Sequence, residues 1–134
     1  MKRLSIILTL LWAWSATAQV APSEALKHYI NNGDKSFAWE VRDSLRTNEA
    51  TAYLLRMQSQ TWREFEWIHE LVVIVPDKLT NNEALIHISG GSADEKTGEP
   101  NYHGWDDSLI GFMTGIATRC EAITAILWQG PRQP

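Results

Sequence analysis

The alternation of apolar and polar residues predicts a β-hairpin early in the chain. Phe37–Leu45 begins with aromatic and apolar residues at every second position, which is typical of a half-buried strand. Arg46–Glu49 is polar and predicts a turn. Thr51–Ser59 again alternates and therefore predicts the partner strand.

Three later segments are apolar without clear alternation. Within a third predicted strand, about Ile68–Val75, the part Leu71–Val75 is apolar on both faces. Ala122–Trp128 shares this property, and Ala84–Ser89 also predicts a buried strand. Strands that are apolar on both faces are typical of the interior of a sheet whose two faces are covered.

A single well-marked helix is predicted between the last two strands. Ser108–Arg119 carries a helical apolar stripe, and Asp106 and Asp107 lie at its positive end, where they suit capping. The stripe consists of Leu109, Phe112, Met113 and Ile116.

The order of these elements predicts the fold class. Antiparallel strands followed by a strand–helix–strand crossover indicate a mixed α/β sheet in which the last two strands are parallel neighbours. The crossover helix and a short helix at Ala21–Tyr29 give too little cover for interior strands. We therefore expect an incomplete domain, the first part of a larger protein. The alternative is that the 134 residues form a small independent domain.

The N-terminus predicts export. Lys2 and Arg3 precede the apolar run Leu4–Trp14, and Ala16-Thr17-Ala18 is a small-x-small cleavage site. We expect a signal peptide at residues 1–18, a helix and turn at 19–35 and the main domain at 36–134, in the secreted or periplasmic space. The alternative is an uncleaved anchor.

Charge and cysteine content narrow the possible partners. Cleavage leaves 116 residues with 10 basic and 16 acidic side chains, a net charge of −6. Such an acidic chain without a basic cluster argues against nucleic acid or an anionic membrane as a partner. Cys120 is the single cysteine, so no internal disulfide is possible, and we expect it to be a small core residue.

Several segments, taken together, carry a resemblance to a known family. The chain resembles the N-terminal portion of the PhoPQ-activated pathogenicity-related protein family, roughly from Ser36 to Pro134. The matching segments are Ser36-Phe37-Ala38-Trp39-Glu40, Leu54–Trp62, Trp67-Ile68-His69-Glu70-Leu71, Val73-Ile74-Val75-Pro76, Ala84–Ser92 and Ala122–Pro134.

The resemblance implies an α/β-hydrolase-like sheet. In that fold the loop that follows Ala84–Ser89 can supply an oxyanion-hole N–H, which makes Gly90, Gly91 and Ser92 candidate oxyanion residues. From the residues alone, this Gly-Gly-Ser segment also fits a simple strand-to-loop turn.

The residues of a complete catalytic or metal site are not recognisable. The chain has no Gly-x-Ser-x-Gly elbow, and a local triad of Ser92, His103 and Asp106 or Asp107 fits no known spacing. We expect His103 to lie in a solvated loop. The four histidines lack zinc-site spacing, and no phosphate loop or dinucleotide fingerprint occurs, so we predict no metal and no cofactor. His87, inside an apolar strand, is expected to be a hydrogen-bonded core residue.

The tryptophans offer a second candidate surface. Trp62 and Trp105 fall in predicted loops and are candidates for ligand binding by stacking, whereas Trp39, Trp67 and Trp128 are expected to pack in or beside the sheet. A sugar-binding module is one interpretation of this content.

Two functional hypotheses remain from the sequence. The first is an N-terminal fragment of a secreted α/β-hydrolase-like protein, inactive alone, whose whole protein would hydrolyse ester or amide bonds. The second is a non-catalytic exported binding or signalling protein on the same sheet, with a small-molecule, peptide or protein partner. Whether the protein is an enzyme is left open, because fold analogy is weak support for an activity.

Overall fold

The structure, a computed structural model, describes residues 21–129, except for the side chain of Trp62. The chain divides into two units, Met1–Gly33 and Asp34–Pro134. The described part of the first unit contains helix α2, Pro22–Ile30, which confirms the predicted N-terminal helix. The elements of the second unit are β1 Ala38–Arg46, β2 Ala50–Trp62, β3 Phe65–Pro76, β4 Ala84–Ile88, α3 Ser108–Cys120 and β5 Ile123–Leu127.

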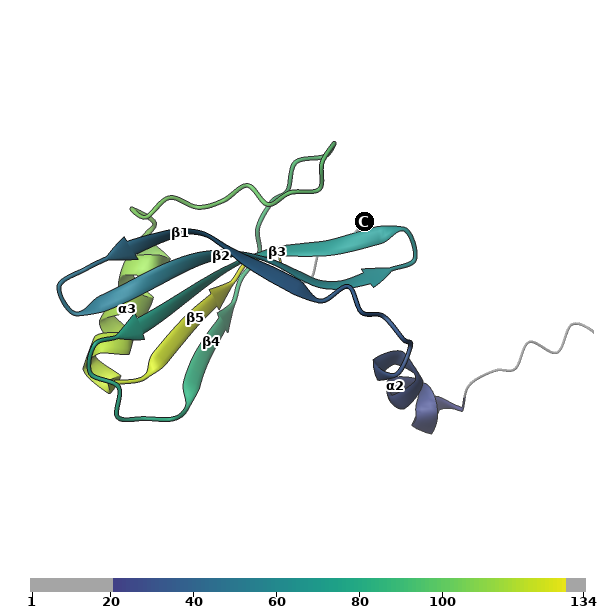
Figure 1. The fold of residues 1–134 in the computed structure, drawn as a ribbon, viewed down its shortest axis with the longest axis horizontal. Helices are drawn as coiled ribbons and strands as arrows, with labels where there is room; N and C mark the ends of the chain where they lie inside the picture. The colour runs from purple at the N-terminus through teal and green to yellow at the C-terminus, as the bar shows by residue number, and fades with distance from the viewer. Residues whose placement is uncertain (1–20, 130–134) are drawn as a thin grey trace, which may run out of the picture. The chain divides into compact units, whose positions relative to one another are not determined.

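The five strands form one mixed sheet in the order β1-β2-β3-β5-β4 (Figure 1). β1, β2, β3 and β5 pair antiparallel in that order, whereas β4 and β5 are parallel. The mixed α/β sheet and its two parallel neighbours are therefore confirmed. The crossover through α3 inserts β5 between β3 and β4, which makes β4 an edge strand.

The hairpin of β2 and β3 is longer than the sequence predicted. The two strands were predicted at Thr51–Ser59 and about Ile68–Val75, but the ladder continues to the pair Trp62 and Phe65, with a two-residue turn at positions 63 and 64. Arg63 adopts a left-handed conformation there, with φ of 56°. Glu64 and Glu66 are exposed and the polar residues Gln58–Thr61 are partly buried, so the polarity of this stretch does not interrupt the ladder.

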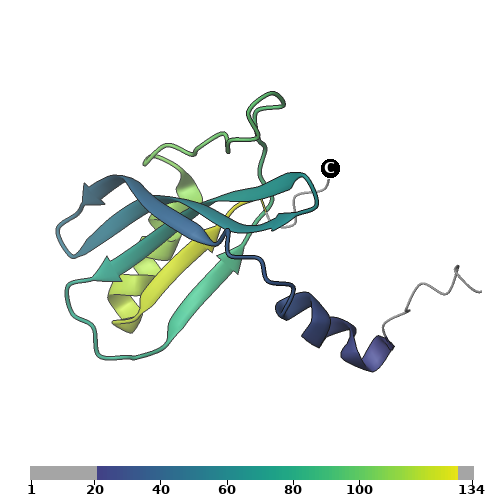
Figure 2. The same ribbon diagram turned by 45° about the vertical axis from the view of Figure 1, so that its right-hand side comes forward.

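The core lies between one face of the sheet and α3, which packs across that face in both views (Figures 1 and 2). Alternate residues of the central strands, such as Val72 and Ile74 on β3, point towards the helix. The buried members of the core are Ala50, Ala52, Val72, Ile74, Ile110, Met113, Ala117, Ile126 and Trp128. The helix stripe is rotated from the predicted one, because Ile110 and Ala117 are buried and Phe112 is exposed.

The opposite face of the sheet has no helix on it within the described part of the second unit. Trp39, Val41 and Tyr53 are exposed there, although Leu55 and Ala125 are shielded by their neighbours. Trp39 was expected to pack in or beside the sheet, but no described residue covers it and its side chain is exposed, so this expectation is wrong.

β4 and two single residues also differ from the prediction. All five residues of β4 are exposed, because an edge strand has one strand neighbour and α3 packs on β2, β3 and β5 but not on β4. His87 is therefore exposed and not a core histidine. Cys120, at the end of α3, is likewise exposed and not a core residue. No helix among the described residues is long and apolar enough to cross a membrane.

The difference between the two faces gives a matched pair of substitutions. Ile74 is fully buried under α3, whereas Ile88 is 64 % exposed. We expect Ile74→Ala to lower the free energy of unfolding by about 2–4 kcal/mol, because it leaves a cavity in the core. Ile88→Ala should change it by less than about 0.5 kcal/mol. Urea denaturation of the full chain measures both, and an equal loss would show that Ile88 is buried in solution.

Candidate functional site

The segment between β4 and α3 forms the candidate site at the end of the sheet where β4 and β5 end. It leaves the sheet, rises as a narrow loop and returns to the start of α3 (Figure 1). Ser89 N donates to Leu127 O at 2.8 Å, which continues the pairing with β5. A bridge between Ala93 and Pro100 then closes the loop on itself, so that the residues after 100 come back beside the end of β4.

Gly91 lies directly against the side chain of Gln129. A Cβ atom at Gly91 would be 2.5 Å from Gln129 Nε2 and 3.1 Å from its backbone N, whereas Gly90 has open space. Gln129 is 3 % exposed, and its Oε1 accepts the backbone N–H of Glu70 at 2.8 Å. Its Nε2 donates to Ser92 O at 3.4 Å. Gln129 therefore joins β3 to the Gly-Gly-Ser segment.

The Gly-Gly-Ser segment has free backbone donors. No described residue accepts a hydrogen bond from the backbone N–H of Gly90, Gly91 or Ser92. Ser92 O accepts the N–H of Asn101 at 2.9 Å, and Ser92 Oγ accepts from Asn101 Nδ2 at 2.9 Å. The three predicted oxyanion residues are consecutive. The carbonyl and hydroxyl groups of Ser92 are engaged, and the N–H groups of all three residues are available for a ligand oxygen.

Glu70 and His103 form a pair beside this segment. Glu70 is fully buried, and its carboxylate accepts the backbone N–H of His103 at 3.0 Å and contacts His103 Nδ1 at 2.7 Å. The ring of His103 stacks on Trp128 with centroids 4.4 Å apart. A carboxylate accepts hydrogen bonds, so Nδ1 is the donor in this contact, and the imidazole tautomer with its proton on Nδ1 leaves Nε2 as an acceptor.

This pair was not predicted from the sequence. His103 was expected to lie in a solvated loop, and its pairing with Asp106 or Asp107 was considered and set aside because the spacing fits no known arrangement. Asp107 instead caps α3 and accepts the N–H groups of Leu109 and Ile110, which confirms the capping prediction for that residue. The available signal was a glutamate inside an apolar interior strand, because a buried charge requires a partner.

An ion pair fixes the loop to the sheet. Arg56 on β2 binds both carboxylate oxygens of Glu99, through Nε at 2.9 and 3.1 Å and through a terminal nitrogen at 2.8 Å. Tyr102 donates to the same carboxylate at 3.3 Å, and Arg42 lies over the Tyr102 ring. The hydrogen bond from Arg56 holds the pKa of Glu99 below its ordinary value. This pair therefore positions the residues between Glu99 and His103.

The two predicted ligand-binding tryptophans lie elsewhere. Trp105 packs against the core, and its indole N–H donates to Asp43 at 2.9 Å, which lowers the pKa of that carboxyl. Trp62 is the last residue of β2, at the tip of the long hairpin. The structure does not bring them to the Gly-Gly-Ser segment, and their ligand-binding role stays a prediction. Trp128 is buried as expected.

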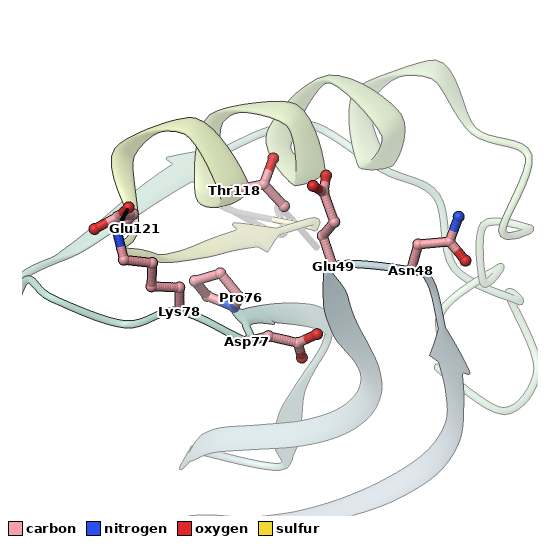
Figure 3. Close-up of a pocket in the computed structure, with 7 residues that line it drawn as sticks. All are labelled: Asn48, Glu49, Pro76, Asp77, Lys78, Thr118 and Glu121. Carbon is pink, nitrogen blue, oxygen red and sulfur yellow. Dashed lines mark hydrogen bonds and ion pairs between the residues drawn. The ribbon is translucent and has the colours of Figure 1, made fainter.

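A cleft of about 320 Å³ lies at the opposite end of the sheet (Figure 3). It is lined by Asn48, Glu49, Pro76, Asp77, Lys78, Thr118 and Glu121. Its charged groups are largely paired, since Lys78 binds Glu121 and Arg46 binds Asp77. The first pair joins the β3–β4 loop to the end of α3 and the second joins it to the end of β1, so we interpret the cleft as a structural junction. Within residues 21–129, no three His, Cys, Asp or Glu side chains are grouped to hold a metal ion.

Comparisons of the sequence with known proteins identify a family. The sequence model of the PhoPQ-activated pathogenicity-related protein family matches residues 26–134. The chain is also similar to Autocrine proliferation repressor protein A of Dictyostelium discoideum, with 30% identity over 77 residues. That match covers 54% of this chain, which spans only 16% of the relative's length. No solved structure matches the chain.

The contact of Gly91 with Gln129 predicts a difference between two adjacent glycines. We expect Gly91→Ala to lower the free energy of unfolding by about 1–2 kcal/mol, because the added methyl group overlaps the buried side chain of Gln129, which two hydrogen bonds hold in place. Gly90→Ala meets open space and should change stability by less than about 0.5 kcal/mol. Chemical denaturation of both variants measures this. Equal values would show that the segment does not pack on Gln129.

The Arg56–Glu99 pair predicts a pH-dependent release of the loop. The pKa of Glu99 is lower in the folded protein, so the pair stabilises the loop fully above the unfolded carboxyl pKa of about 4.3. That stabilisation is lost as the pH falls through the lower folded value. The protection factors of residues 93–107, which compare the observed exchange rates with the intrinsic rates at the same pH, should therefore fall on acidification from pH 6 to pH 3. Glu99→Gln should show lower protection at pH 6 and a smaller fall, and an unchanged profile would contradict this role.

Proposed function

Because the chain belongs to the PhoPQ-activated pathogenicity-related protein family, we propose that it is the N-terminal portion of an exported α/β-hydrolase-like protein. In this proposal the Gly90–Ser92 segment binds the oxygen of a carbonyl group. The chain by itself lacks a complete catalytic site, and the whole protein hydrolyses ester or amide bonds.

The observation that carries the proposal is the set of free N–H groups at Gly90, Gly91 and Ser92. They follow a strand and precede the crossover helix α3, which is the position where an α/β-hydrolase supplies an oxyanion N–H. Packing of Gly91 on Gln129 holds the segment in place, and such preorganisation is what stabilises a developing oxyanion.

The exposed apolar residues support the proposal that more polypeptide packs against this sheet. β4 exposes Leu85, Ile86 and Ile88, although its neighbour β5 is largely buried. A five-residue edge strand without charge or proline is an unprotected edge, which proteins usually cover. Further strands and helices of a longer protein are the proposed cover.

The alternative is a non-catalytic exported binding or signalling protein. It is favoured by the uncovered sheet face around Trp39, Val41 and Tyr53, since exposed apolar patches mark interaction surfaces. The name of the Dictyostelium relative describes a repressor of proliferation, and a signalling role would require no hydrolysis.

Export is proposed from the N-terminal pattern, which lies outside the described residues. We expect the native exported protein to begin at Gln19 and to have a mass well above that of residues 19–134. N-terminal sequencing and intact mass of the protein from its source measure both. An N-terminus at Met1 would contradict export by cleavage, and a mass equal to residues 19–134 would contradict the fragment proposal.

The same preparation separates the enzyme from the binding protein. If the protein is a hydrolase, it should cleave p-nitrophenyl acetate and bind a fluorophosphonate covalently at a serine outside residues 19–134. Heat-denatured protein is the control for non-specific reaction. Absence of both reactions would leave binding or signalling as the proposed function.

A further inference from the structure

The Glu70–His103 pair presents one defined hydrogen-bond acceptor. Glu70 is completely buried and engages both the backbone N–H and Nδ1 of His103, and stacking on Trp128 holds the plane of the ring. The side chain of His103 is 30% exposed. A ring that is fixed at Nδ1 and only half-buried has its Nε2 available to an incoming donor.

Two chains of contacts connect this acceptor to the N–H groups of the Gly-Gly-Ser segment. Asn101, two residues before His103, binds Ser92 through its backbone and its side chain. Gln129, next to Trp128, binds the backbone N–H of Glu70 and the carbonyl oxygen of Ser92. The acceptor and the donors therefore belong to one hydrogen-bonded assembly at one end of the sheet.

We propose that this assembly binds a neutral amide group. Nε2 of His103 accepts the amide N–H, and the backbone N–H groups of Gly90–Ser92 donate to the amide oxygen. The inference rests on the proposed function in one respect, that the Gly-Gly-Ser segment binds a carbonyl oxygen. It goes further by selecting an amide over an ester and by giving Glu70 and His103 a positioning and a binding role.

The chemistry of the two halves selects the ligand. An ester offers an oxygen to the N–H groups but has no proton to donate to Nε2, so it satisfies only half of the assembly. A carboxylate also lacks this proton, and its charge is disfavoured by the buried carboxylate of Glu70. An amide satisfies both halves and carries no charge.

N-methylacetamide and methyl acetate are suitable probes, because they have nearly the same shape and differ in one N–H group. Each is titrated into the ¹⁵N-labelled full chain, and NMR follows the ring nitrogens of His103 and the amide signals of Gly90–Ser92. We expect His103 Nε2 and the Gly-Gly-Ser amides to shift together with a single Kd for N-methylacetamide. Methyl acetate should bind about fivefold more weakly, which corresponds to the loss of one neutral hydrogen bond.

The exposed His87 on β4 is the internal control, and its ring signals should not shift with either probe.

Glu70→Gln tests the positioning role. In either orientation a glutamine directs its NH₂ group at one of the two His103 donors, so one hydrogen bond is lost and Nε2 is less well fixed. In this variant the dissociation constants of N-methylacetamide and methyl acetate should become nearly equal, while the amide signals of Gly90–Ser92 still shift with both probes. The same preference after this substitution would overturn the role of Glu70.

The outcomes separate this inference from the proposed function. If the Gly-Gly-Ser amides respond equally to both probes and His103 responds no more than His87, the carbonyl-binding segment stands and the amide site is overturned. If His103 and the Gly-Gly-Ser amides give different dissociation constants, the two halves are not one site and the inference is again overturned. If neither group responds to either probe, the inference and the carbonyl-binding role both fail.

Discussion

The buried carboxylate of Glu70 is the interaction on which the end of the sheet depends. A charge that is removed from water must be compensated by hydrogen bonds, and here both donors come from His103, thirty-three residues later in the chain. The backbone of Glu70 makes two further hydrogen bonds: its carbonyl oxygen accepts the N–H of Trp128, and its own N–H donates to the side chain of Gln129. One residue of β3 thus ties together the end of β5 and the segment that leads into α3.

The strands and the crossover helix were predictable because their signals are local. Alternation in the first hairpin, the apolar run of β3 and the Asp107 cap each depend on neighbouring residues, and these elements appear within a few residues of the expected bounds. The parallel pairing of β4 and β5 followed from the strand–helix–strand order, since a crossover of this kind joins parallel strands.

The misses concern properties that depend on distant parts of the chain. The composition of β4 is that of an interior strand, but its burial is set by the position of β5, which enters the sheet on the inner side. The partner of His103 was sought among nearby aspartates, whereas it comes from a strand far away in sequence. The Gly-Gly-Ser segment was found from its composition, but its contact with Gln129 required the folded end of β5.

The long β2–β3 hairpin divides the sheet into two parts that differ in cooperativity. Near α3, β3 has strand neighbours on both sides and a packed helix on one face, so a residue there opens only when many contacts break together. Beyond Gln58, β3 is the one strand among the described residues that pairs with β2, and the ribbon projects from the sheet (Figure 1). A two-stranded ribbon gains little from burial, so its tip is able to open as a local event. The tip is thus a place where the chain can adapt its shape at low cost, whereas the carboxylate of Glu70 lies where the ribbon meets the rigid sheet.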